Sequence, residues 1–514
     1  MRKIVSVFLV ILLLSVLTSF TQLKITANAN SNVIYVPGDF PTIQMAINNA
    51  SIGDTIVVNG TFHEDIVINK SISLFGVNDY SAVIQGSQSQ SVVSITANNV
   101  HVKNFTITKG ITGPDDIGIR LASNNNTVEN NKVTNINSGF LLSLCSNNRI
   151  SKNFIFNKLI DDNGISLYRS SNNVFSDNII SNNAIGVSIS QLSNNNVFSG
   201  NTVSNNTVGF SIQLSSNNVF SGNTFVNNSP EISLDFSSSN IFYHNNFNGS
   251  VQVTSGLFNY WSVGGEGNYW SNYHDLDSNN DGVGDQPYVI DQNNQDSFPL
   301  MGIFSDHVAM LKGKAYAVTI VSNSTISDFS FDVGEETGNR IVSFVSNEED
   351  AVGFCRIMIL TELMSYPYVV LVSGEEVAPN LLSVSNETTA FLYFTYTGGN
   401  QTISVISSKT LHLYYELFDK YSALQASFSN LNVSYYQLLD NYSLLLYNYT
   451  QLQNQYSALN ASYQEHLLDY SKNVENIQNL AYVFASTTAA FLMITIYLSK
   501  RATSKNRSRE LAPE

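Results

Sequence analysis

The sequence predicts a mainly β chain: a right-handed parallel β-helix, then a β-sandwich-like domain, a long α-helical coiled coil and one transmembrane helix. Three patterns carry this prediction. Residues 123–248 repeat with a period of 22 to 25 residues, residues 302–408 hold short β-branched and aromatic runs, and residues 414–470 follow a seven-residue period. These patterns are typical of a solenoid, an antiparallel β domain and a coiled coil, in that order.

Each repeat contains a short apolar run with an asparagine in a fixed place, followed by a second run that a glycine opens. The asparagines are Asn131, Asn153, Asn178, Asn201, Asn223 and Asn245. The glycines are Gly118, Gly139, Gly164, Gly186 and Gly209. Strands this short cannot bury a core alone, so we expect them to stack coil on coil with like apolar residues in inward columns.

The recurrent asparagine predicts a hydrogen-bonded ladder rather than a reactive site. An asparagine at a tight corner tolerates left-handed backbone and can bond to its own image in the next coil, about 4.8 Å away. Leucine-rich repeats have a similar period, but these Asn- and Val-rich units lack the Leu-x-x-Leu-x-Leu spacing of that class.

The start of the repeat region carries its most specific motifs. Residues 41–50 have apolar residues at helical spacing, which predicts a helix that plugs the open end of the stack, and GDTIVV and GTFHEDI follow. With these motifs, residues 34–301 resemble the NosD-type periplasmic copper-binding proteins of the pectin-lyase-like superfamily, with their carbohydrate-binding and sugar-hydrolysis repeats. The resemblance implies a β-helix with copper or polysaccharide as ligand.

Two apolar ends predict a chain anchored at the cell surface. Residues 1–29 combine a basic start, an apolar run and a small-residue site, which is typical of a cleaved signal peptide. Residues 479–499 carry no charge and could span about 30 Å of hydrocarbon. The basic tail, residues 500–514, is expected to stay cytoplasmic. The bulk of the chain would then be extracellular or periplasmic.

Between these ends we expect three domains. Residues 30–301 form the β-helix with its cap helix and a calcium-type loop, and residues 302–410 form the β-sandwich-like domain, which is similar to modules of archaeal surface proteins. Residues 411–478 form a coiled-coil stalk, in which tyrosine and leucine columns recur every seven residues. Self-association of parallel stalks would give a homo-oligomer whose copy number stays open.

Composition excludes some functions. Lys and Arg number 24 against 40 Asp and Glu, so the net charge is -16, and only 12% of residues are charged. Nucleic-acid binding is disfavoured because it needs basic clusters. The two cysteines, Cys145 and Cys355, lie too far apart in sequence to suggest a disulfide framework and are expected to be buried thiols.

Two pairs of aspartates are the candidate catalytic residues. Asp115 and Asp116, like Asp161 and Asp162, each precede the glycine of their coil, so the pairs fall in one column two coils apart. That separation, about 10 Å, lies at the upper edge of the 6.5 to 9.5 Å used for inverting hydrolysis. The family resemblance implies carboxylates on one exposed sheet, as in members that cleave polysaccharide. The alternative is that these aspartates are solvated turn residues.

Residues 277–285, DSNNDGVGD, predict a calcium loop. The expected ligands are Asp277, Asn279, Asp281, the carbonyl of Val283, and Asp285. Tyr288 stands where a calcium sensor has a bidentate glutamate, so the loop indicates a weak extracellular site. The alternative is an Asp-rich turn without metal.

Copper, which the family resemblance implies, finds little support in the residue pattern. Copper prefers imidazole and thioether groups that lie together. The histidines are scattered and form no His-x-His pair: His63, His101, His244, His274, His307, His412 and His466.

The function expected from these patterns is a membrane-anchored cell-surface β-helix protein that binds glycans or other surface components without catalysis. The first alternative is a polysaccharide lyase or hydrolase that uses the aspartate column. The second is NosD-like copper binding or maturation.

Overall fold

The computed structural model describes residues 32–77, 80–87, 89–110, 113, 115–156, 163–335, 337–450 and 456–506. The predicted signal peptide and most of the basic tail lie outside these residues. The described chain forms two compact units. The first contains residues 32–272 and Pro287–Ser297, and the second contains Tyr273–Gln286 and the chain from Phe298 onwards.

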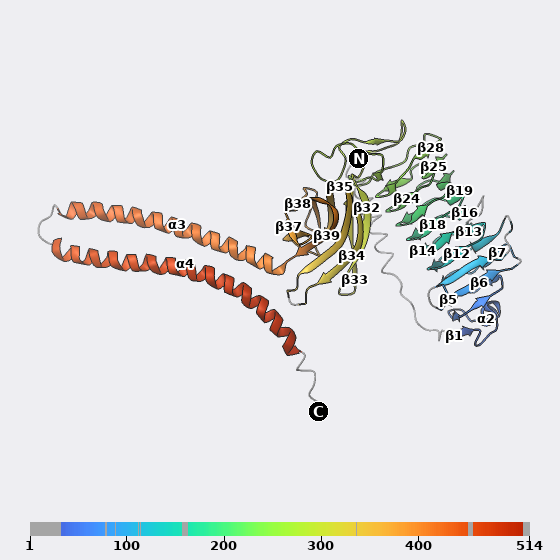
Figure 1. Cartoon of the computed structure of the whole chain (residues 1–514), viewed down its shortest axis with the longest axis horizontal. Helices are drawn as coiled ribbons and strands as arrows, with labels where there is room; N and C mark the ends of the chain where they lie inside the picture. Colours follow the sequence, from blue (N-terminus) through green and yellow to red (C-terminus); the bar gives the residue numbers. More distant parts are fainter. Residues whose placement is uncertain are drawn as a thin grey trace, which may run out of the picture. The chain divides into compact units, whose positions relative to one another are not determined.

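The first unit is a right-handed parallel β-helix of about ten turns, as the repeat predicts (Figure 1). Each turn gives one strand to each of three parallel sheets, named A, B and C here. Sheet A contains β1 (Val33–Val36), β2 (Thr55–Val58), β5 (Ser73–Gly76), β8 (His101–Lys103), β11 (Thr127–Glu129), β14 (Arg149–Ser151), β17 (Val174–Ser176), β20 (Val197–Ser199), β23 (Val219–Ser221) and β26 (Ile241–Tyr243).

The other two sheets follow the same order along the stack. Sheet B contains β3 (Thr61–Phe62), β6 (Ala82–Gly86), β9 (Phe105–Lys109), β12 (Lys132–Thr134), β15 (Phe154–Phe156), β18 (Ile179–Ser181), β21 (Thr202–Ser204), β24 (Thr224–Val226), β27 (Asn246–Phe247) and β29 (Tyr269–Trp270). Sheet C contains β4 (Ile66–Ile68), β7 (Ser91–Ile95), β10 (Ile117–Leu121), β13 (Ser138–Ser143), β16 (Asn163–Tyr168), β19 (Ile185–Ser190), β22 (Val208–Gln213), β25 (Ile232–Asp235) and β28 (Val251–Val253).

The core consists of inward columns of like residues, as expected. Phe175, Phe198, Phe220 and Phe242 are paired in successive strands of sheet A and are fully buried. Their rings stack at centroid distances of 4.6 to 5.2 Å. Because the coils stack in register, each phenylalanine ring packs on the equivalent ring of the next coil and is shielded from water.

A helix covers the first coil, as the spacing predicts. α2 (Ile43–Asn49) buries Ile43, Ala46 and Ile47 against the stack. The Thr42 hydroxyl accepts the amide of Met45 and caps the helix N-terminus.

The predicted asparagine ladder is present, and a second one runs beside it. In the first ladder, the backbone amide and Nδ2 of Asn178 both donate to Asn201 Oδ1, at 3.0 and 2.9 Å, and Nδ2 also donates to the carbonyl of Ile150. The second ladder has the same bonds between its members, Asn126, Asn148, Asn173, Asn196, Asn218, Asn240 and Asn259. These buried amides are satisfied because each coil supplies the acceptor that its neighbour needs.

The left-handed backbone expected at the ladder asparagine lies one residue earlier. Asn130, Lys152 and Asp177, which precede members of the first ladder, have φ values of 53°, 55° and 56°. The chain therefore turns at an exposed or half-buried residue and then points the next side chain inward. This division of roles explains the paired asparagines of the sequence, in which the first residue turns and the second bonds.

The last coil is closed by the segment that returns to the first unit, which holds the short hairpin of β30 (Tyr288–Val289) and β31 (Gln295–Asp296). The buried carboxylate of Asp296 accepts the Asn268 amide at 2.7 Å and the Trp270 indole at 3.0 Å. At the end of the second ladder, Asn294 Oδ1 accepts the Asn259 amide at 3.0 Å and the Trp261 indole at 3.1 Å. Both ladders thus end on acceptors rather than on unpaired donors.

The second unit contains one antiparallel sheet of eight strands with a buried core. Its strands are β32 (Ile303–Leu311), β33 (Lys314–Ser322), β34 (Thr325–Val333), β35 (Arg340–Leu360), β36 (Tyr368–Val372), β37 (Glu375–Val377), β38 (Asn380–Leu381) and β39 (Thr389–Ser407). The strands and their buried core make this a β domain, and its sandwich-like architecture stays a prediction. In the described residues the long strands β35 and β39 pair along both their halves, so hydrogen bonds join all the strands into one sheet.

The predicted stalk is not one continuous helix. α3 (Lys409–Thr450) and α4 (Tyr456–Asn506) run antiparallel, side by side (Figure 1). Tyr435 stacks on Tyr470 with centroids 3.8 Å apart, and Tyr442 on Tyr463 at 5.6 Å. The tyrosine column that the heptads predict therefore pairs within one chain.

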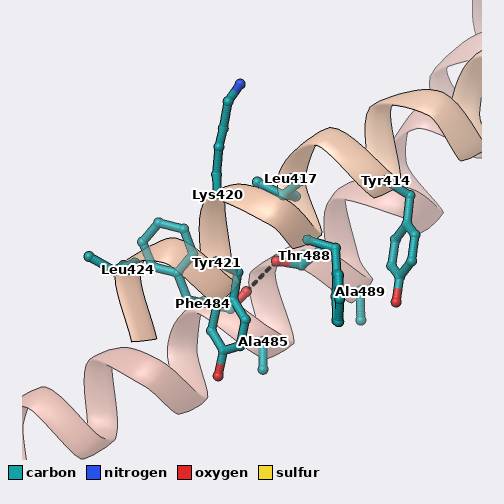
Figure 2. Close-up of a pocket in the computed structure, with 10 residues that line it drawn as sticks. Tyr414, Leu417, Lys420, Tyr421, Leu424, Phe484, Ala485, Thr488 and Ala489 are labelled. Atoms are coloured by element: carbon teal, nitrogen blue, oxygen red, sulfur yellow. Dashed lines mark hydrogen bonds between the residues drawn. The ribbon is translucent and has the colours of Figure 1, made fainter. Parts of the chain in front are cut away.

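α4 also continues through the segment that we expect to cross a membrane. A groove of about 660 Å³ between the two helices is lined by Tyr421 and Leu424 of α3 and by Phe484 and Ala489 of α4, while Lys420 extends away from it (Figure 2). Within the described residues, the hydropathy of the helices does not reach that of a membrane span over a sufficient length.

Candidate functional site

The predicted aspartate column starts at the turn before sheet C. Ile117, Ser138 and Asn163 are aligned in successive strands, so the residue before each of them occupies one column. Asp115 and Asp116 lie in this turn. Asp161 and Asp162 fall outside the described residues, so a site made by both pairs stays a prediction.

Asp116 already has a structural role. Its buried carboxylate forms an ion pair with Lys109 Nζ at 2.5 Å and accepts the amide of Gly113. Lys109 Nζ also donates to the carbonyl of Ser89 at 2.8 Å. Removing one partner would leave the other charge buried and unpaired, at a cost of several kcal/mol, so the ion pair holds this turn in place. The neighbouring Asp115 is exposed.

The predicted calcium loop, residues 277–285, is held together by its own carboxylates. Asp277 accepts the amides of Asp281 and Gly282 through separate oxygens, at 3.0 and 2.8 Å. Asp281 accepts the amide of Val283 at 2.9 Å. Burial raises the pKa of the Asp277 carboxyl, and the negative charge of Asp281 acts in the same direction. These oxygens therefore satisfy backbone amides inside the turn.

The other predicted ligands are also used within the loop. Asn279 Nδ2 donates to Asp281 Oδ2, and Asp285 accepts the amide of Ser278, both at 2.9 Å. Across the part of the chain that the structure describes, no three acidic, histidine or cysteine side chains lie close enough to hold a metal ion. Calcium binding at this loop has no support from the geometry.

The histidines do not gather into a copper site in the described residues. His101 bonds to Glu129 at 2.9 Å, and His244 bonds to Glu266 at 2.6 Å. His307 stacks on Phe329, and burial lowers its pKa. These three imidazoles have different local partners, and the geometry of the described residues does not bring together the donor set that copper prefers.

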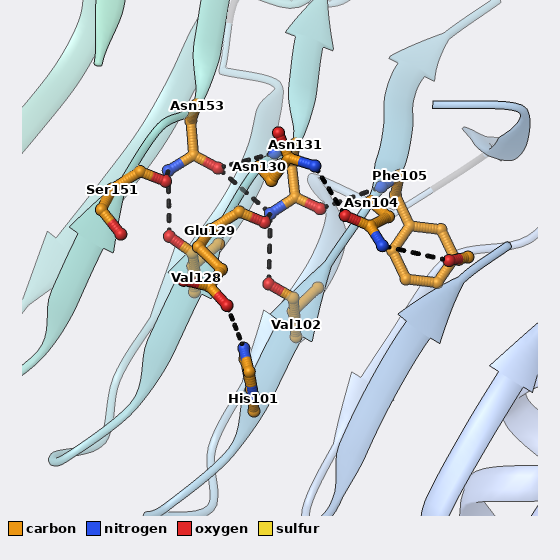
Figure 3. A network of polar contacts seen from close by, with 11 residues as sticks. His101, Val102, Asn104, Phe105, Val128, Glu129, Asn130, Asn131, Ser151 and Asn153 are labelled. Carbon is orange, nitrogen blue, oxygen red and sulfur yellow. Dashed lines mark hydrogen bonds and ion pairs between the residues drawn. The ribbon is translucent and has the colours of Figure 1, made fainter. Parts of the chain in front are cut away.

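A cluster of polar groups lies on the outer face of sheet A near its N-terminal end (Figure 3). His101 and Glu129 pair between β8 and β11, and about a third of each side chain is exposed. His101 meets the edge of the Phe75 ring at 4.9 Å, and Lys103 Nζ lies 4.3 Å over the same ring. The cluster offers an imidazole, a carboxylate and an ammonium group to solvent.

The polar cluster continues around the corner toward sheet B. Asn130 Nδ2 donates to Asn104 Oδ1 at 2.7 Å (Figure 3). The Tyr80 hydroxyl donates to Asn130 Oδ1 at 2.9 Å. Asn104 and Asn130 are the left-handed corner residues of successive coils. Their side chains are oriented by each other and by Tyr80, so the corner is polar and ordered.

A pair of aromatic rings lies on the outer face of sheet B. Phe154 and Phe156 point outward from β15, are partly exposed, and stack at 5.9 Å with their planes 22° apart. Lys132 precedes Phe154 in the same column, and Ile179 follows it. Two nearly parallel rings with polar neighbours form an apolar platform at the protein surface.

Sequence reasoning missed both outer surfaces. His101, Glu129 and Phe75 come from three different coils, and the spacing between those coils is larger than in the regular repeats. The Phe-Ile-Phe run of β15 alternates, so its two rings point the same way. This alternation was the available signal for Phe154 and Phe156.

Comparison with known proteins shows what the β-helix is similar to. Residues 47–275 match the family model of the periplasmic copper-binding protein NosD. The NosD resemblance expected from the cap helix and the repeats is therefore confirmed for this segment. The match lies within the β-helix and includes neither the eight-stranded sheet nor α3 and α4. A search of the curated proteins finds no match.

Several solved structures are similar to the chain. The tailspike protein gp49 from Acinetobacter baumannii bacteriophage Fri1, a capsular polysaccharide depolymerase, is 11% identical, with 74% of this chain and 88% of that chain covered and a TM-score of 0.36. Pectate lyase Pel9A is 14% identical, with coverage of 48% and 75% and a TM-score of 0.35. The polygalacturonase from Erwinia carotovora ssp. carotovora is 12% identical, with coverage of 48% and 85% and a TM-score of 0.33.

Proposed function

We propose that this chain is a cell-surface protein whose NosD-type β-helix binds glycans on the outer face of sheet B. The observation that carries the proposal is the aromatic platform, Phe154 and Phe156. Sugar rings present apolar C–H faces, which stack on aromatic side chains, and hydroxyl groups, which bond to polar neighbours. Thr106 and Thr202, each two coils from Phe154 in the same column, supply such neighbours on the same face.

The charge of the chain favours a neutral glycan. With a net charge of -16, the protein repels acidic polymers at long range, and Lys132 offsets little of that charge. We infer binding without catalysis because Asp116 is committed to its ion pair with Lys109. Neutral oligosaccharides are therefore the first probes.

Titration calorimetry of the whole chain with cellohexaose, xylohexaose and oligogalacturonate tests this function. We expect one of the neutral hexamers to bind more tightly than oligogalacturonate, and Phe154→Ala or Phe156→Ala to weaken that binding about tenfold. Ile179→Ala is the matched control, since it removes an exposed apolar side chain from the same face in the next coil. Absence of binding to all three probes, or equal loss with the control, contradicts the proposal.

We also propose that the chain is secreted by the signal in residues 1–29 and held in the membrane by residues 479–499, with the bulk outside and the tail in the cytoplasm. The uncharged segment and its basic flank support this anchoring. Insertion requires the end of α4 to leave the groove that it forms with α3.

Membrane fractionation of the full chain tests the anchor. The wild type is expected to resist carbonate extraction, and Ala485→Arg with Ala489→Arg is expected to release it, because each buried arginine costs about 2.5 to 3.5 kcal/mol of insertion. Lys472→Arg, outside the segment, is the control. Extraction of the wild type into the soluble fraction contradicts membrane anchoring and leaves glycan binding to be judged separately.

A further inference from the structure

A row of large apolar side chains follows the corner where each coil passes from sheet C to sheet A. Leu144, Leu192, Leu214 and Phe236, called the apolar ridge below, are 70%, 66%, 41% and 63% exposed. Leu144, Arg169, Gln191, Leu214 and Phe236 occupy one position of successive coils, and Leu192 is one extra residue that follows Gln191 at the same corner. The ridge is therefore interrupted by Arg169, and in the next coil the corner is shared by Gln191 and Leu192.

The ridge residues adopt a backbone conformation that does not suit them. Their φ values are 56°, 67°, 50° and 46°, in the left-handed region. A residue with a Cβ pays about 1 to 2 kcal/mol there, and asparagine is the side chain that tolerates it best. The next corner of the same coils uses asparagine, at Asn147, Asn172, Asn195 and Asn217.

Folding of one chain does not account for the ridge. A leucine in left-handed backbone is strained, and an exposed leucine gains little from the hydrophobic effect. Strained residues of this kind persist where a function retains them. A contact that covers the side chains in an assembly would supply the missing burial.

Charge indicates what covers the ridge. The flanks of Leu192 and Leu214 are neutral, with Ser190 and Gln213 on one side and Ser171 and Ser216 on the other. A second copy of a chain with a net charge of -16 meets least repulsion on such a strip.

Two charges interrupt the strip: Arg169 is exposed, and Asp235 is half-buried and accepts hydrogen bonds from Thr254 and Gln213. Arg169 stands one coil before Leu192, and Asp235 stands beside Phe236, one coil after Leu214. The two charges are therefore placed symmetrically about the midpoint between Leu192 and Leu214. A two-fold axis at that midpoint would bring each arginine to the aspartate of the other copy.

We propose that two copies of this chain pair antiparallel along the apolar ridge, with Leu192 of one copy against Leu214 of the other and with two Arg169–Asp235 ion pairs. From Leu144 to Phe236 the strip is about 19 Å long, at about 4.8 Å per coil. An interface of that length lies at the small end of specific contacts, so we expect a dissociation constant of about 1 to 100 µM. The pairing uses the corner between sheets C and A, so the glycan-binding face on sheet B stays open.

Sedimentation velocity of the full chain over about 1 to 200 µM tests the pairing. The wild type is expected to form dimers, and Leu192→Asn with Leu214→Asn to stay monomeric. Asparagine suits left-handed backbone, so the melting temperature of this variant should be unchanged or higher. Ser188→Asn, on the outer face of sheet C, is the control for the added amides.

Charge reversal tests the orientation. Arg169→Asp or Asp235→Arg alone should weaken the dimer about tenfold, and the two together should restore it. Cysteine pairs give a second reading, because Leu192→Cys with Leu214→Cys should crosslink two antiparallel copies, whereas Leu192→Cys alone should not. Crosslinking of Leu192→Cys alone would instead assign a parallel pair and overturn the proposed symmetry.

A monomeric wild type at all concentrations, or a dimer that the asparagine variant leaves intact, overturns the proposal. In the second case the helices are the next place to look for the contact. Ridge-dependent binding of a monomer to phosphatidylcholine vesicles would assign the ridge to a lipid surface instead. None of these outcomes alters the calorimetric test of Phe154 and Phe156.

Discussion

The β-helix and the helical hairpin are both built from sequence repeats, but they use them differently. In the β-helix each repeated asparagine and phenylalanine is buried against its own image in the next coil. In the hairpin the tyrosines stack across the two helices, whereas Leu424, Leu431 and Leu438 are 58%, 64% and 67% exposed. In a solenoid each repeat packs on the neighbouring repeats of the same chain. A heptad pattern does not specify whether its apolar face packs on a helix of the same chain or of another chain.

Hydrogen bonds account for part of this difference. A ladder asparagine bonds through its side chain and its backbone to the next coil, so a shift of one residue breaks several buried bonds at once. The helices satisfy their backbone internally and contact each other through side chains. Their pairing is therefore easier to rearrange than the stacking of coils.

The largest expected effect comes from cutting a ladder. Asn201→Ala removes the acceptor of two donors on Asn178 and two side-chain bonds to Phe175 and Asn223. Buried groups left without partners cost about 1 to 3 kcal/mol each, so we expect a loss of about 3 to 5 kcal/mol in urea unfolding. Asn195→Ala, at an exposed left-handed corner, should cost about 1 kcal/mol. Equal losses of unfolding free energy for Asn201→Ala and Asn195→Ala would mean that a ladder asparagine stabilises the fold no more than a corner asparagine does.

The next prediction compares the stability lost from the buried phenylalanine column of the β-helix with that lost from the exposed leucine column of the helical hairpin. Phe198→Ala should destabilise the β-helix by about 3 to 5 kcal/mol, since the ring is fully buried between Phe175 and Phe220. Leu431→Ala should change the stability of the hairpin by less than about 0.5 kcal/mol, because most of its side chain is already in water. Thermal unfolding followed by circular dichroism measures both. A loss above about 2 kcal/mol for Leu431→Ala would show that another helix covers this column, as in a parallel coiled coil.

The sequence predicted the β-helix well because its period is set by contacts that repeat within the chain. The six predicted asparagines are all in the first ladder, and the cap helix lies where the spacing of Ile43, Ala46 and Ile47 indicates. The second ladder was missed because several of its members, such as Asn148, Asn173 and Asn218, are the second asparagines of SNN corners, which look like loop residues in a sequence.

The hairpin and the candidate site were harder to predict for a physical reason. Tyrosine heptads fit a parallel coiled coil and an antiparallel hairpin equally well, since both bury one face of each helix. Asp116 looks catalytic in the sequence because its partner, Lys109, precedes it by only seven residues and the turn between them hides the pairing. The outer surfaces depend on which side chains the coils leave exposed, and the period alone does not specify this.

A smaller effect is expected where the hairpin helices meet. Tyr435 and Tyr470 stack with their planes 3° apart, and the Tyr470 hydroxyl lies 3.5 Å from Asn432 Oδ1. A double-mutant cycle with Tyr435→Ala and Tyr470→Ala should give a coupling energy of about 0.5 to 1.5 kcal/mol. Tyr436→Ala with Tyr470→Ala serves as the control cycle, because Tyr436 is largely exposed and should show little coupling. Zero coupling between Tyr435 and Tyr470 would mean that the antiparallel pairing is not maintained in solution.

The end of a third, shorter ladder gives the smallest effect, which depends on pH. Asn183, Asn206 and Asn228 lead to Glu231, which is fully buried and accepts Asn228 Nδ2 at 2.5 Å. Its other oxygen has no hydrogen-bond partner among the described residues. Burial raises the pKa of Glu231 above its usual 4.5, and the bond from Asn228 only partly opposes this.

A raised pKa means that the folded protein favours the protonated carboxyl. The resulting stability is present below pH 4.5 and is lost as the pH rises through the folded-state pKa. Glu231→Gln removes this titration, so its free energy of unfolding relative to wild type should increase from about pH 4 to about pH 8. Urea unfolding at several pH values measures the difference. A difference that stays constant with pH, or that decreases, would contradict a raised pKa of Glu231 at the end of this ladder.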